Sequence, residues 1–241
     1  MFHSKGPTFF ELAVQALSST ERGYDLLATK FDYTPFRTPK PVLDAALIRV
    51  QPHAPFHCAL DLCCGTGAAI EAFRSLCLRR LVGIDFSKGM LAVARRNLAN
   101  GSGQAKVEWV RGNVLNLPFA AEFDLVLCFG AHGHILRQDE SHFVGEVARV
   151  LRPKGRFVFV TSFPPSTWSR THWECRIFNA SMRLRNSLIS PPFIMYYLTF
   201  LLPEIKLLLE QHAFDVAVHP LAVDGPLARY QLVMASKQSV R

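Results

Sequence analysis

The chain has 241 residues, of which 49% are apolar and 19% charged, and it carries a formal net charge of +8 at pH 7. These numbers exclude a disordered chain and predict one large α/β domain around a single core. The basic residues form no run of about five or six that would indicate a nucleic-acid-binding arm. The charge therefore fits either attraction of anionic ligands or simple solubility.

The six cysteines show no CxxC pair and no repeated spacing, which argues against a zinc site and a disulfide framework. We therefore expect no bound metal, free thiols and a cytoplasmic location. The longest apolar stretch is residues 188–202, and Pro191 and Pro192 interrupt it. It is shorter than the roughly 18 to 20 apolar residues that are needed to cross a bilayer. The N-terminus has no long apolar core behind a basic start, so we expect no signal peptide.

Short apolar runs alternate with amphipathic segments, which is the pattern of a parallel sheet with helices on both faces. The expected helices cover residues 39–50, 68–78, 88–99, 141–151 and 203–212. The expected strands cover residues 58–62, 81–84, 107–111, 123–129, 156–161, 214–219 and 230–235. The last two strands are separated only by a turn at 224–226, which predicts an antiparallel hairpin at one edge of the sheet.

Capping and breaking residues set several of these boundaries. Thr38 is the expected N-cap of the first helix, and Ser87 that of the helix that Asn100 and Gly101 end. Pro153 and Gly155 are expected to separate the helix at 141–151 from the following strand.

A glycine turn follows the first strand, at the carboxyl edge where parallel sheets bind ligands. Gly65 and Gly67 allow close approach of the backbone, and the helix behind them presents free N–H groups. Asp85 ends the second strand 20 residues beyond Gly65, and its two oxygens suit the hydroxyls of a ribose. The pattern predicts a nucleoside cofactor. It lacks the third glycine of a dinucleotide fingerprint, because Ile70 stands there.

Adding Asp61 turns the pattern into DxxxGxG, and here the chain resembles the class I S-adenosylmethionine-dependent methyltransferases of small-molecule type. Segments 111–119, 123–126 and 146–155 are similar to the family's adenine loop, fourth strand and turn before the fifth strand. The resemblance covers about residues 55–162. It implies a Rossmann-like, doubly wound, seven-stranded sheet, mostly parallel with a C-terminal antiparallel hairpin.

The resemblance also implies S-adenosyl-L-methionine as the cofactor and a set of residues around it. Asp61 would orient the loop and the amino group, Asp85 would hold the ribose, and Asn113 stands where the family usually has an aspartate that accepts from the adenine amine. The full predicted set is Asp61, Cys63, Gly65, Thr66, Gly67, Asp85, Phe86, Met90, Asn113, Val114 and Phe129. For Met90 and Phe129, packing in the core is an equally good interpretation.

Candidates for proton transfer follow the fourth strand. His134 matches a histidine common in small-molecule members of the family and is the predicted catalytic residue, with His132 beside it as a second candidate. The alternative role for a histidine at this place is a hydrogen bond to the backbone. A base is needed only if the acceptor must lose a proton. The N-terminal aromatic residues Tyr24, Phe31 and Tyr33 are expected over the cofactor or the acceptor, or in ordinary packing.

We expect one domain with four parts: an N-terminal helical cap at 1–50, a cofactor-binding core at 51–163, an insertion over the active site at 164–202, and a C-terminal helix and hairpin at 203–238. The apolar C-terminal part of the insertion, residues 193–202, predicts a lid over an apolar or aromatic acceptor. A peripheral membrane contact through 188–202 and extra core packing are the alternatives.

The segment after the fourth strand lacks the Asn/Asp-Pro-Pro-aromatic run of enzymes that methylate base amines, so no nucleic-acid partner is expected. The first hypothesis is in-line transfer of a methyl group to the oxygen, nitrogen or carbon of a small molecule. A cofactor-binding scaffold without catalysis comes second, and a nucleic-acid or protein methyltransferase third. The oligomeric state is not predicted.

Overall fold

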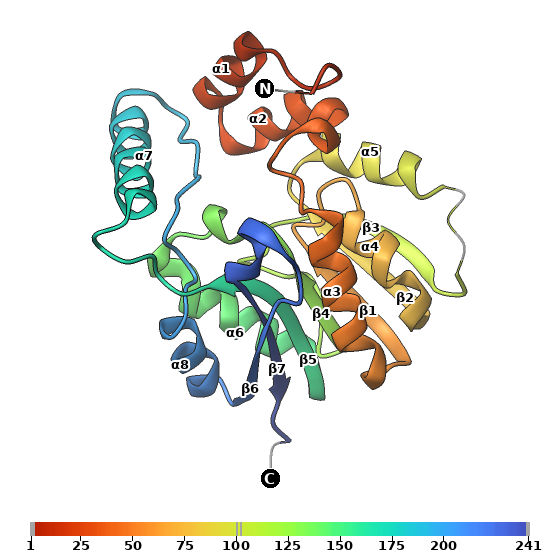
Figure 1. The fold of residues 1–241 in the computed structure, drawn as a ribbon. Coiled ribbons are helices and arrows are strands. Elements are labelled where there is room, and N and C mark those ends of the chain that lie inside the picture. The colour runs from red at the N-terminus through yellow and green to blue at the C-terminus, as the bar shows by residue number, and fades with distance from the viewer. Residues whose placement is uncertain (1–2, 100, 102, 240–241) are drawn as a thin grey trace.

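The computed structural model describes residues 3–99, 101 and 103–239, and its seven strands form one sheet in the order β3-β2-β1-β4-β5-β7-β6 (Figure 1). The strands are β1 (Phe56–Leu62), β2 (Cys77–Asp85), β3 (Lys106–Arg111), β4 (Phe123–Cys128), β5 (Leu151–Ser162), β6 (Phe214–Pro220) and β7 (Tyr230–Lys237). Strands β1 to β5 pair in parallel, whereas β7 pairs antiparallel with both β5 and β6. The predicted Rossmann-like sheet and its C-terminal hairpin are confirmed.

Helices cover both faces of this sheet (Figure 1). On one face lie α3 (Lys40–Val50), α4 (Ala68–Phe73) and α5 (Lys88–Asn97), which share a core with Ala59 of β1. On the other face lie α6 (Glu140–Val150) and α8 (Glu204–Gln211), which share a second core with Leu60 and Leu62. Because successive side chains of β1 point to opposite faces and both faces are covered, the strand is apolar almost throughout.

Several predicted boundaries differ from the structure. The helix predicted at 68–78 ends at Phe73 and continues as a 3₁₀ turn over Arg74–Leu76. Strand β2 therefore begins at Cys77, four residues earlier than predicted, because β1 itself begins at Phe56 and pairs with Cys77.

Strand β5 also begins early, at Leu151, so the predicted break at Pro153 and Gly155 is wrong. Phe123 pairs with Leu151 and Leu125 with Arg156, so the extra residues of β5 bulge out of the ladder instead of ending it. At the helix starts, Ser87 accepts from the Met90 N–H at 3.1 Å as predicted, whereas the residue before α3 is Pro39 rather than Thr38. Asn100 lies outside the described residues.

The remaining helices lie beyond the carboxyl ends of the parallel strands. They are α1 (Phe9–Leu17), α2 (Thr20–Leu27) and α7 (Arg170–Leu188), with a 3₁₀ segment η1 (Ala28–Tyr33). Figure 1 shows α1 and α2 at one end of the molecule and α7 standing beside them, away from the sheet. Within the described part of the chain, no helix is long and apolar enough to cross a membrane.

Candidate active site

A cavity of about 690 Å³ opens where β1, β2, β4 and β5 end. The side chains and loops around it come from the sheet edge, from α2 and η1, and from the segment after α7. Nine of the predicted site residues line it: Asp61, Cys63, Gly65, Thr66, Asp85, Phe86, Met90, Phe129 and His134. Tyr24 and Phe31 line it as well.

The two glycines of the turn have different tasks. Gly65 has φ +51°, and a Cβ built on it would meet no atom within 4 Å, so the loop surface beside the cavity stays open. Gly67 has φ +88°, and its Cβ would lie 2.6 Å from Leu98 Cδ1 and 3.1 Å from the ring of Trp109. Gly65 therefore allows a ligand to approach, whereas Gly67 allows the turn to pack on the helix and strand behind it.

Asp61 is a buried carboxylate whose Oδ2 has no hydrogen-bond partner among the residues that the structure describes. Burial raises the pKa of this group well above its usual value, and the charge of Asp85 adds to the effect. A buried polar atom without a partner is costly unless a ligand satisfies it. A cationic amino group in the cavity would do so, because it favours the ionised carboxylate and donates to it.

Asp85 is buried too, but both of its oxygens are held by the backbone. Oδ2 accepts from the Gly65 N–H and Oδ1 from the Ser87 N–H, each at 2.9 Å. Burial raises the pKa of Asp85 to about 6, while the two N–H groups act in the opposite direction. The carboxylate is thus fixed in orientation and keeps lone pairs for two ligand hydroxyls.

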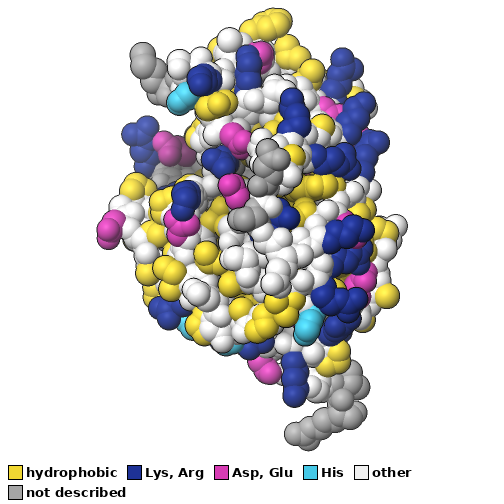
Figure 2. Space-filling view, turned by 90° about the vertical axis from the view of Figure 1, so that its right-hand side faces the viewer, with side chains coloured by type: hydrophobic (Ala, Val, Ile, Leu, Met, Phe, Trp, Pro, Cys, Tyr) yellow, Lys and Arg dark blue, Asp and Glu magenta, His cyan; other side chains and the backbone are white. Residues whose placement is uncertain are grey.

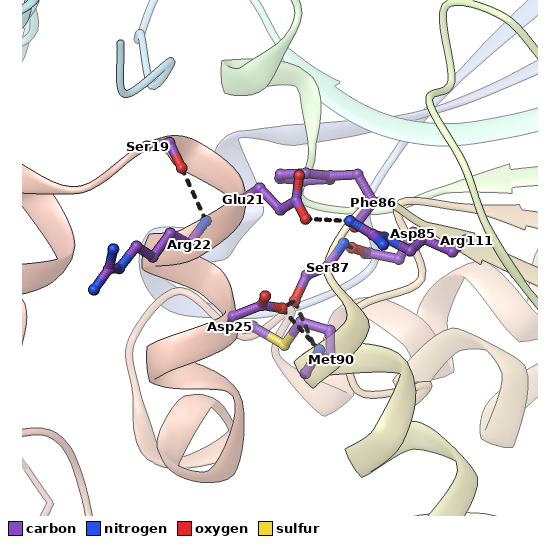
Figure 3. A network of polar contacts seen from close by, with 10 residues as sticks. Ser19, Glu21, Arg22, Asp25, Asp85, Phe86, Ser87, Met90 and Arg111 are labelled. Atoms are coloured by element: carbon purple, nitrogen blue, oxygen red, sulfur yellow. Dashed lines mark hydrogen bonds and ion pairs between the residues drawn. The ribbon is translucent and has the colours of Figure 1, made fainter. Parts of the chain in front are cut away.

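Hydrogen bonds join helix α2 to the loop that follows Asp85 (Figure 3). Asp25 accepts from the Ser87 hydroxyl at 2.6 Å and from the Gly89 N–H at 2.8 Å. Glu21 forms an ion pair with Arg111, whose Nε also donates to the Phe86 carbonyl at 3.1 Å. These contacts place the N-terminal helices against the wall formed by β2 and β3.

A second polar link joins the N-terminal segment to the glycine turn. The Thr66 hydroxyl donates to Asp32 at 2.6 Å, and Arg37 Nε lies 3.3 Å from the same carboxylate. Arg37 lines the cavity, and its buried Nε makes no hydrogen bond within the described part of the chain. The arrangement brings a cation to the turn. Sequence reasoning missed Asp32 and Arg37, because neither belongs to a local pattern and the link spans 34 residues.

His134 is hydrogen-bonded at both ring nitrogens. Nδ1 lies 2.5 Å from the Ile194 carbonyl and Nε2 lies 2.7 Å from the Tyr24 hydroxyl. Because a carbonyl only accepts, Nδ1 carries the proton, and the neutral ring accepts the Tyr24 proton at Nε2. Burial lowers the pKa of His134 and raises that of Tyr24, so both groups are neutral.

His132 lines the cavity but lies in an apolar setting. Its ring stacks on Phe200 with centroids 4.2 Å apart, and its Nε2 is buried without a partner. Burial lowers its pKa to about 3, so the ring is a neutral wall of the cavity at any ordinary pH.

Three predicted cofactor residues are not among the lining residues: Gly67, Asn113 and Val114. Asn113 is exposed and its Oδ1 accepts from the Leu115 N–H at 3.0 Å, while Val114 packs in the core. Their contact with the adenine stays a prediction. Tyr33, expected over the cofactor or acceptor or in ordinary packing, stacks on His3.

Much of the remaining lining of the cavity is apolar and aromatic. It includes Phe36, Phe163, Met195, Tyr196 and Leu201. Within 193–202, Phe193, Phe200 and Leu202 are buried, and Tyr197 is the one apolar or aromatic side chain of the segment that is exposed. The segment thus supplies both wall and core, two of the interpretations that the sequence left open.

The glycine turn and the two buried carboxylates stand at the carboxyl edge of the sheet, where Rossmann-like sheets bind nucleoside cofactors. Residues 59–155 match the family model described as "Methyltransferase domain". Over this core the chain is similar to the methyltransferases that the family model describes.

Two curated relatives are quinone methyltransferases. The chain is 34% identical over 112 residues to the demethylmenaquinone methyltransferase of Lactococcus lactis, covering 44% of this chain and 42% of that protein. It is 37% identical over 119 residues to the 2-phytyl-1,4-beta-naphthoquinone methyltransferase of Arabidopsis thaliana, covering 46% and 44%. The matched segment is thus less than half of either relative. An O-methyltransferase family protein from Burkholderia thailandensis shares the fold at a TM-score of 0.68 and 16% identity, covering 99% of this chain and 66% of that one.

Proposed function

We propose that the protein transfers a methyl group from S-adenosyl-L-methionine to an apolar aromatic small molecule, with reduced quinones as the first acceptors to test. The observation that carries the proposal is Asp61, which lines the cavity beside the glycine turn and whose buried Oδ2 has no hydrogen-bond partner among the described residues. A ligand with an amino group satisfies this atom, and the methionine end of the cofactor has one. When bound, the cofactor supplies a methyl group on a sulfonium, with a neutral thioether as leaving group.

Different residues of the chain bind different parts of the cofactor. Asp61 holds the amino group and Asp85 the ribose hydroxyls. Arg37, a cation at the glycine turn, meets the carboxylate of the methionine end. Phe86 and Met90 pack on the adenine, Asn113 and Val114 read its edge, and Phe129 lies near the sulfonium. The loop of Cys63, Gly65 and Thr66 provides the surface on which the methionine part lies.

The apolar wall supports an apolar acceptor. Methyl transfer is an in-line displacement that mainly requires the acceptor to be held in line and water to be kept out. Aromatic side chains such as Phe36, Phe163 and Tyr196 pack well on a flat ring and expel water from it. The two named quinone methyltransferases support the same acceptor class.

Tyr24 and His134 provide a route for an acceptor proton. The Tyr24 oxygen accepts a hydrogen bond from an acceptor hydroxyl while its own proton is donated to His134 Nε2. As the hydroxyl gives its proton to Tyr24, the Tyr24 proton moves to His134, and the acceptor becomes the more electron-rich phenolate. His134 thus serves as the base through Tyr24.

Calorimetry with S-adenosylhomocysteine and with NAD tests the cofactor, using the wild type and Asp85→Ala. We expect the first ligand to bind, NAD not to bind, and the variant to lose affinity. A panel of reduced quinones, phenols and amines with labelled cofactor then tests transfer. Tight NAD binding without the adenosyl ligand contradicts the proposal, and cofactor binding without transfer to any acceptor favours a non-catalytic scaffold.

A further inference from the structure

Helix α7 presents an apolar stripe to solvent. Although it has 19 residues, none of them is buried. Trp173, Ile177, Leu184 and Leu188 are 57%, 65%, 61% and 75% exposed, and their spacing of four, seven and four residues places them on one side of the helix. The opposite side, with Cys175, faces the protein and lines the cavity.

Helix α1 also exposes its apolar side chains to solvent. Phe10, Val14 and Leu17 lie on one side of the helix and are exposed, Phe10 at 75%, and Phe9 beside them is 82% exposed. Gln15, in contrast, is buried. A surface helix of a globular protein normally does the reverse, turning its apolar residues inward.

The two helices belong to the same end of the molecule. The Arg185 guanidinium of α7 donates to the Ala16 carbonyl at 2.9 Å and to the Ser18 carbonyl at 2.8 Å, at the end of α1. Figure 1 shows both helices beyond the sheet, and Figure 2 shows hydrophobic side chains at the top of the molecule, over α1. We call these two exposed sides, with Phe9, Phe10, Val14, Leu17, Trp173, Ile177, Leu184 and Leu188, the apolar end.

Cations border the stripe on α7. Arg170, Arg176 and Arg183 are exposed. The single acid of the helix, Glu174, is paired with Arg170 at 2.7 Å, and the structure gives Arg176 and Arg183 no acidic partner among the described residues. Trp168, just before the helix, is 94% exposed. Apolar side chains with flanking arginines and a tryptophan are the chemistry that enters the headgroup region of an anionic bilayer.

We propose that the apolar end docks the protein on an anionic lipid surface, with α1 and α7 lying in the interface. Charge decides between this occupant and a second copy of the chain. Pairing two copies through this face would bring the arginines of both together, whereas anionic headgroups neutralise them. The contact uses α1 and α7 rather than the buried side chains of 193–202. The cavity then lies behind α7, on the side of the helix away from the bilayer, because Thr171 and Cys175 of α7 line it.

Co-sedimentation with vesicles tests the proposal on the full chain without cofactor or acceptor, so its outcome is independent of the proposed function. The vesicles contain either phosphatidylcholine alone or phosphatidylcholine with phosphatidylglycerol. We expect binding to the anionic vesicles, and a partition coefficient at least about tenfold lower for the triple variant I177S/L184S/L188S. Arg176→Gln with Arg183→Gln should weaken binding to anionic vesicles and leave binding to neutral ones unchanged.

The matched control is I48S/L207S, which removes two exposed apolar side chains from α3 and α8, away from the apolar end. It should bind vesicles as the wild type does. Because the substituted side chains are exposed, the triple variant should keep the circular dichroism spectrum and the cooperative thermal unfolding of the wild type, which shows that it is folded. Equal vesicle binding by the wild type and the folded triple variant overturns the proposal. So does a wild type that ignores anionic vesicles and sediments as a dimer that the triple variant converts to a monomer.

Discussion

Replacing Asp61 with asparagine separates ligand recognition from folding. The side chain keeps its size but loses its ionisable oxygen, and Asp61 is only 2% exposed, with Oδ2 unpartnered. A hydrogen bond to a charged group contributes about 1.5 to 3 kcal/mol, so the Kd for S-adenosylhomocysteine should rise about 10- to 150-fold. The free energy of unfolding of the ligand-free protein should stay within about 1 kcal/mol or rise, because an unpaired buried carboxyl is costly in the wild type.

Titration calorimetry measures the first quantity and urea denaturation the second. Asp44→Asn on the surface of α3, where Asp44 pairs with Lys40 at 2.7 Å, serves as the control and should change neither by much. The reasoning fails if Asp61→Asn lowers the free energy of unfolding by several kcal/mol while the Kd is unchanged. That result would make Asp61 a structural group rather than a ligand for an amino group.

Three further predictions address the same cavity. Since the pKa of Asp85 is raised to about 6, lowering the pH from about 7.5 to 5 should protonate this carboxylate and weaken S-adenosylhomocysteine binding about tenfold. A Kd that does not change with pH in calorimetry would refute this. The contribution of Asp85 to the free energy of unfolding of the ligand-free protein has the opposite dependence and is lost as the pH rises through about 6. Gly65→Ala should mainly raise the Kd and Gly67→Ala mainly lower the melting temperature, because only the second Cβ meets packed side chains; equal melting temperatures would contradict the assignment. Tyr24→Phe should lower kcat at least about tenfold but change cofactor affinity less than about threefold, since the hydroxyl bonded to His134 serves the acceptor; an unchanged kcat and pH–rate profile would remove the proton route.

The sheet could be predicted because its strands are apolar runs closed by turn residues. The end of α4 could not, since residues 74–80 mix apolar and basic side chains that suit a helix or a strand, and pairing with β1 decides between them. The apolar faces of α1 and α7 have helical spacing, but periodicity alone does not say whether a face turns to the core or to solvent.

For the site, the motif identified Asp61 and Asp85 because both follow from strand ends at a fixed spacing. The partners of the other groups come from contacts between distant segments. Tyr24 meets His134 across 110 residues, and Thr66 meets Asp32 across 34. Local patterns contain no information on such pairs, so the hydrogen-bonded state of His134 and the position of Arg37 emerged only from the structure.

Two of the segments around the cavity, α2 and residues 193–202, are far apart in the chain. The Ile194 N–H donates to the Thr20 hydroxyl at 2.7 Å and the Thr20 N–H to the Pro192 carbonyl at 3.3 Å, so α2 and the segment after α7 are bonded to each other. The carboxylates for the cofactor, in contrast, stand on β1 and β2. Substitutions in residues 193–202 can therefore change which acceptor fits while Asp61 and Asp85 stay in place. New acceptor specificities are best sought by varying the side chains of 193–202 while Thr20 is kept, because this segment is bonded to α2 through its own backbone and the Thr20 hydroxyl.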